Sequence, residues 1–199
     1  MERYYYHGLD GGFVECLKGM LLIINSGELK TRNMNMDKND SKYDRYNHVC
    51  LYRKNEEFDY DAGLEAFCKS ARAGWIDHCW FFIVSPDVSA KNVAQSSKVG
   101  FDEFGNPLTN LVDEWRSDGS IPLDKVVGIG IPFDNIEEEA KQFGCFYGSN
   151  VVYSIDEYYQ LLNSLIELAN SFHWIIANSD EKDVCDKLDE QLNKHNIKL

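Results

Sequence analysis

Short apolar or alternating segments in the first two thirds of the chain predict β-strands. The most apolar of them, residues 79–84 (CWFFIV), is typical of a central strand. Residues 48–53 (HVCLYR) alternate instead, which predicts that Cys50 and Tyr52 lie on one face of a strand and Val49 and Leu51 on the other. Further strands are predicted at residues 4–7, 111–116 and 125–131.

Apolar side chains recur at helical spacing in other segments. The first helix is predicted to end at Gly27, because glycine readily adopts the backbone conformation that follows a helix. Its apolar side chains are Phe13, Leu17, Met20, Leu21 and Ile24. Longer helices are predicted at residues 155–174 and 180–195, and shorter ones at 61–73 and 135–143. The polar segment 33–47 is predicted to be a loop.

Together these elements indicate an α+β fold. The strands do not alternate regularly with long helices, which disfavours a doubly wound parallel sheet. We expect one domain over residues 1–199. Residues 1–133 would form an α+β body with an early helix, and residues 134–199 a helical C-terminal extension packed on it.

The charge of the chain limits its partners. The 199 residues carry a formal net charge of −13, which disfavours a general nucleic-acid binder. The charge is uneven, since residues 1–54 have a net charge of +2, residues 55–133 of −7 and residues 134–199 of −8. An anionic ligand therefore meets the least unfavourable field in the first quarter of the chain.

Two further classes of protein are disfavoured. The six cysteines form no CxxC pair and match no zinc spacing, so we expect free thiols and no bound metal. Neither a signal peptide nor a segment long and apolar enough to span a bilayer is recognisable, so we expect a protein with no membrane partner that is cytoplasmic, the alternative being export by a route that leaves no N-terminal mark.

Three short motifs have side chains suited to chemistry. His7-Gly8 ends the first strand, where an imidazole can bond a ligand and a glycine lets it approach closely. Cys50 and Tyr52 offer a small group and an aromatic ring on one face of a strand. Glu114 begins the EWRSDGSIP segment, where a carboxylate on a rigid strand could orient a ribose hydroxyl. Each motif also has a structural interpretation: a surface histidine, a buried cysteine and a solvated acid.

The order of these motifs along the chain is more informative than any one of them. The chain contains, in this order, HG, a helix, the HVCLYR strand, an apolar strand and DEWR…IP…VVGIGIP. This order resembles the ADP-ribosyltransferase superfamily, in the branch with a His–Tyr–Glu triad related to diphtheria-toxin-like and DarT-like enzymes. The resemblance covers about residues 4–132. It implies the split antiparallel β body of that superfamily and NAD as the substrate.

The resemblance also implies roles for individual residues. His7 and Gly8 match the first motif, which holds nicotinamide and the adenosine ribose. Tyr52 would pack the nicotinamide, while Glu114 would polarise the nicotinamide ribose. Cys50 stands where many relatives have serine, and Arg32 is a candidate for binding the NAD pyrophosphate.

The sequence also departs from the family pattern. Val112 precedes Glu114 by two positions, so the ExE pattern of arginine-directed enzymes is absent. The acceptor of ADP-ribose is unknown, with a protein favoured over a nucleic acid by the overall acidity. The main alternative is a catalytically inactive module that binds a nucleotide or a protein. RNA 2′-phosphotransferase is disfavoured, because few cations beyond Arg32, Arg53 and His48 could hold a phosphate.

Overall fold

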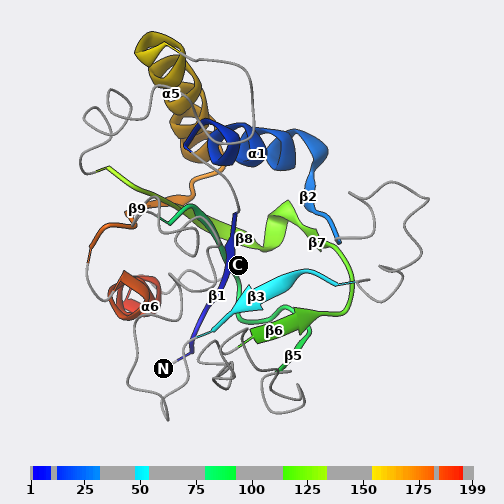
Figure 1. Cartoon of the computed structure of the whole chain (residues 1–199). Helices are drawn as coiled ribbons and strands as arrows, with labels where there is room; N and C mark the ends of the chain where they lie inside the picture. Colours follow the sequence, from blue (N-terminus) through cyan, green and yellow to red (C-terminus); the bar gives the residue numbers. More distant parts are fainter. Residues whose placement is uncertain are drawn as a thin grey trace, which may run out of the picture.

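The computed structural model describes residues 2–9, 13–31, 48–53, 79–92, 114–133, 154–181 and 184–194. Within these ranges the chain forms a seven-stranded sheet, ordered β5-β6-β3-β1-β4-β8-β9, and a two-stranded ribbon of β2 and β7 (Figure 1). The strands of the large sheet are β1 (Tyr5–Gly8), β3 (Cys50–Tyr52), β4 (Phe81–Val84), β5 (Ala90–Asn92), β6 (Glu114–Ser117), β8 (Val126–Ile131) and β9 (Ile175–Asn178). The ribbon consists of β2 (Glu28–Leu29) and β7 (Ile121–Pro122), and a short 3-10 helix, η3 (Leu123–Lys125), leads into β8.

The sheet is mixed rather than wholly antiparallel. All its neighbouring strands run antiparallel except β8 and β9, which are parallel. β1 lies between β3 and β4 and pairs with both. The apolar segment predicted to be central becomes β4, between β1 and β8, and its four residues are all buried.

One face of the sheet is covered by two helices that pack against each other, α1 (Phe13–Ser26) and α5 (Ile155–Ser171) (Figure 1). α1 ends where predicted, since Gly27 has a φ of 81°. α5 begins with a capping box, in which the Ser154 hydroxyl accepts a hydrogen bond from the Glu157 backbone N–H at 3.2 Å. The core on this face, named the α1–α5 core, contains Leu17, Met20, Leu51, Phe82, Ile129 and Leu165 among others.

The opposite face is covered by α6 (Val184–Lys194). Its buried side chains Cys185, Leu188 and Leu192 join alternate residues of the central strands in a second cluster, named the α6 core. The other buried members of this cluster, in the strands or just before them, are Tyr4, Tyr6, Tyr52, Cys79, Phe81, Ile83, Val127 and Ala177. Because successive residues of β1 and β4 enter different clusters, the sheet separates two apolar layers.

The predicted mixture of helices and sheet is confirmed, with two corrections. Residues 90–92, where the sequence pattern predicts no strand, form the edge strand β5. The C-terminal extension is not only helical, because residues 175–178 form β9 and extend the sheet beside β8. The predicted helices 61–73 and 135–143 and the predicted loop 33–47 lie outside the described residues.

Candidate functional site

The three strands that carry the sequence motifs are neighbours in the sheet. β1 carries His7 and Gly8 and pairs with β3, which pairs in turn with β6. Tyr6 stands opposite Tyr52, and Tyr52 stands opposite Glu114, the first residue of β6. Motifs more than 100 positions apart in the sequence therefore meet in one row across three strands.

Tyr52 lies in the α6 core, on the face that its alternation with Leu51 predicts. Its ring is 6.3 Å from that of Tyr6, centroid to centroid, and the residue is only 2% exposed. Cys50 is half-buried and is not part of a disulfide. In this arrangement the Tyr52 ring packs against protein, and a nicotinamide could stack on it only after part of this packing opened.

His7 lies on the other face of the sheet. It stands opposite Phe82 in β4, which belongs to the α1–α5 core, and direct cross-strand partners share a face. Its Nδ1 atom is 2.9 Å from the backbone carbonyl oxygen of Cys50. Gly8 continues the ladder opposite Phe81. The sheet thus brings the backbones of His7 and Tyr52 together but not their side chains.

A cation–aromatic cluster on β1, β3 and β6 was not singled out by sequence reasoning. The Arg53 guanidinium lies over two rings, 4.9 Å from the centroid of Tyr5 and 5.4 Å from that of Trp115. Nη1 of Arg53 also donates a hydrogen bond to the Tyr5 hydroxyl oxygen at 3.1 Å. The two rings meet edge to face at 5.5 Å, so the guanidinium is held by aromatic contacts at the end of β3.

A buried carboxyl group joins α6 to β1. Asp189 is 4% exposed, and its Oδ1 accepts hydrogen bonds from the Tyr4 backbone N–H at 3.1 Å and from the Tyr6 hydroxyl at 3.2 Å. Burial raises the pKa of Asp189 from 3.8 to about 6, although the two hydrogen bonds and Arg3 act to lower it. Burial also raises the pKa of Tyr6, whose hydroxyl therefore stays protonated as a donor.

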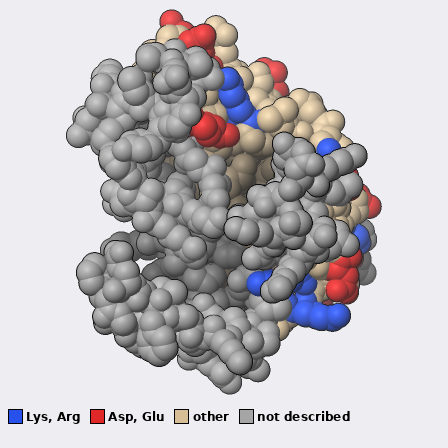
Figure 2. Space-filling model, turned by 45° about the vertical axis from the view of Figure 1, so that its right-hand side comes forward, with Lys and Arg blue, Asp and Glu red and all other residues tan. Residues whose placement is uncertain are grey.

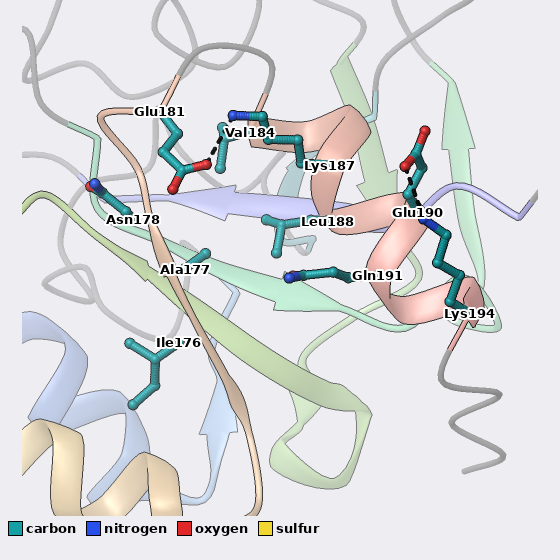
Figure 3. Close-up of a pocket in the computed structure, with 10 residues that line it drawn as sticks. All are labelled: Ile176, Ala177, Asn178, Glu181, Val184, Lys187, Leu188, Glu190, Gln191 and Lys194. Atoms are coloured by element: carbon teal, nitrogen blue, oxygen red, sulfur yellow. Dashed lines mark hydrogen bonds and ion pairs between the residues drawn. The ribbon is translucent and has the colours of Figure 1, made fainter.

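A pocket of about 300 Å³ lies elsewhere, between β9 and α6 (Figure 3). Apolar side chains, among them Ile176 and Leu188, line part of it. Its two lysines bond to carboxylates that also line the pocket: Lys187 Nζ to Glu181 at 3.0 Å and Lys194 Nζ to Glu190 at 3.4 Å. Both cations are thus already paired with carboxylates, and none of the sequence-predicted site residues line this pocket.

The structure describes only part of the two remaining predicted site residues, Glu114 and Arg32. The backbone of Glu114 is placed in β6, while Arg32 lies outside the described residues, next to the buried Thr31. Within the described ranges, no group of three or more His, Cys, Asp or Glu side chains could hold a metal ion. Over the same ranges, no helix has the length and apolar character to cross a bilayer.

Comparison with known proteins adds no assignment: no protein-family model matches the chain, and no curated protein matches it.

Proposed function

We propose that the chain is an NAD-dependent ADP-ribosyltransferase with the split β body of that superfamily. The observation that supports this most strongly is the row of β1, β3 and β6. These strands carry the three motifs of the resemblance, and they are hydrogen-bonded neighbours with Glu114 directly opposite Tyr52.

In the proposed reaction NAD binds across these strands. The bond between C1′ of the ribose and the nicotinamide nitrogen breaks, and its electron pair leaves with nicotinamide. The Glu114 carboxylate accepts a hydrogen bond from a ribose hydroxyl and stabilises the oxocarbenium-like centre. His7 and Gly8 hold the adenosine ribose and the nicotinamide amide. An acceptor nucleophile then bonds to C1′ and loses its proton.

A protein is the proposed acceptor. On the side of the molecule seen in Figure 2, the described acidic and basic side chains lie close together and form no broad basic patch. Phosphate backbones need clustered Lys and Arg, and the net charge of −13 opposes them. A cytoplasmic site of action remains part of the proposal.

The test is release of nicotinamide from NAD, measured by chromatography with and without a cell lysate. We expect Glu114→Gln to lower the rate at least about 100-fold, because the amide loses the charge that stabilises the developing cation. Glu167→Gln, an exposed residue of α5, is the matched control and should leave the rate unchanged. A Glu114→Gln variant that cleaves NAD within twofold of the parent would remove Glu114 from the chemistry.

The second candidate is a catalytically inactive binding module on the same fold. The burial of Tyr52 to 2% exposure and the position of His7 on the opposite face favour it, because a triad must converge on one ligand. If the chain binds NAD but releases no nicotinamide with any acceptor tested, the binding module is the correct candidate.

A further inference from the structure

The Arg53 side chain is half-buried and has no acidic partner in the described part of the chain. Its interactions there are with Tyr5 and Trp115, and no carboxylate of the described residues lies within ion-pair distance of it. The chain has 33 acidic and 20 basic side chains, so a half-buried arginine that avoids every described carboxylate is unusual here. The positive charge of this guanidinium is left uncompensated by the described protein.

A second hydrogen-bond donor beside the Arg53 guanidinium, the indole N–H of Trp115, lacks a partner among the described residues. The Nε1 atom of Trp115 is buried and meets no acceptor among the described residues, although buried N–H groups are normally bonded. The same indole ring lies under the Arg53 guanidinium, 5.4 Å from its central carbon. A guanidinium with no carboxylate partner among the described residues and an indole N–H with no acceptor among them therefore lie side by side, at the end of β3 and on β6.

We propose that Arg53 and Trp115 form an oxyanion site that takes a phosphoryl group. A guanidinium presents its N–H groups as a planar fork that matches phosphate oxygens, and only one end of the fork is used by Tyr5. The aromatic rings hold the fork in place, so little side-chain freedom is lost on binding. The site belongs to residues 1–54 and β6, and the first of these is the part of the chain with a net charge of +2.

The site lies on the same face of the sheet as His7. Tyr5 and His7 are two positions apart on β1, so both point to the α1–α5 face, and Arg53 contacts Tyr5 from the end of β3. A nucleotide ligand could thus reach His7 with its sugar and Arg53 with its phosphate. The two donors would hold the phosphoryl group of a free phosphate as well as that of a nucleotide.

The test uses isothermal titration with four probes: ADP, adenosine, inorganic pyrophosphate and inorganic phosphate. We expect ADP to bind the parent and to lose at least about tenfold in affinity in Arg53→Met, which keeps a chain over the rings but no charge. Trp115→Phe, which keeps an aromatic ring but removes the N–H donor, should weaken ADP binding about threefold or more. Lys91→Met, the same charge change at an exposed residue of β5, should leave binding unchanged.

The probes separate the sources of the phosphoryl group. Binding of ADP but not of the inorganic anions assigns the site to a nucleotide, and binding of pyrophosphate or phosphate alone assigns it to a free anion. Absence of binding by every anionic probe, or equal affinity of parent and Arg53→Met for them, would overturn the inference. The result of this titration does not depend on NAD cleavage. If ADP binding depends on Arg53 but no nicotinamide is released from NAD, the phosphoryl site is supported and the proposed enzymatic activity is refuted.

Discussion

Replacing Asp189 by asparagine tests the buried contact between α6 and β1. The amide oxygen of the introduced side chain can still accept the hydrogen bonds from Tyr4 and Tyr6, so the variant removes the charge and keeps the geometry. The pKa of Asp189 rises from 3.8 to about 6 on burial in the folded protein. That difference corresponds to about 3 kcal/mol, which is an upper value for the effect on stability.

The sign of the effect follows from proton binding. Between pH 3.8 and about 6 the folded state holds the Asp189 proton and the unfolded state has released it. The contribution of Asp189 to stability is therefore complete below pH 3.8, falls as the pH rises through about 6, and is constant above that. At pH 7 the parent buries an ionised carboxylate, whereas the variant buries a neutral amide.

We expect Asp189→Asn to match the parent in free energy of unfolding near pH 4 and to exceed it by about 1 to 3 kcal/mol at pH 7. Urea denaturation of both proteins at intervals from pH 4 to pH 8 gives the difference, in which other titrating groups cancel. Asp186→Asn is the control, because Asp186 is more exposed and its 3.5 Å pair with Arg3 is worth about 0 to 1 kcal/mol. A difference that stays constant across this pH range would refute the reasoning.

Two further substitutions test the packing and the capping. Gly130→Ala should destabilise the fold by about 2 kcal/mol or more in denaturant titration, because a Cβ there would overlap the ring of Phe81; an unchanged midpoint would show that the ring can move aside. Ser154→Ala should cost about 1 kcal/mol by removing the cap of α5, while Ser164→Ala, at an exposed site within the helix, should cost clearly less. Equal effects of the two serine substitutions would contradict the capping role.

Some elements of this fold can be predicted from the local sequence pattern and others cannot. The division of β3 between two faces follows from strict alternation, and the end of α1 follows from Gly27. β5 has the sequence AKN, which carries no apolar signal, because an edge strand buries little. β9 directly follows the apolar stripe of α5, and its pairing with β8 is a long-range contact that no local pattern contains.

The candidate site shows the same division. Sequence order placed His7, Tyr52 and Glu114 on strands, and the sheet makes those strands neighbours. The face that each side chain occupies depends on register, however, and a shift of one residue would exchange the faces. Nothing in the sequence marks Asp189 as buried, because it sits on a helix of otherwise ordinary amphipathic pattern. The sequence shows that residue 53 is an arginine, but it does not predict that no described carboxylate lies within ion-pair distance of it.

The bond between the Tyr4 backbone and Asp189 joins residues 185 positions apart, and this has a consequence for synthesis of the protein. β1 is an inner strand of the sheet and leaves the ribosome early, whereas the helix that covers one of its faces follows 185 positions later. At about 5 to 20 residues per second, Tyr4 and Tyr6 wait on the order of 10 to 40 s for that cover. During this interval the nascent chain exposes Tyr4, Tyr6 and the two β4 residues on the same face, Phe81 and Ile83, and the α6 core cannot form until α6 has been translated.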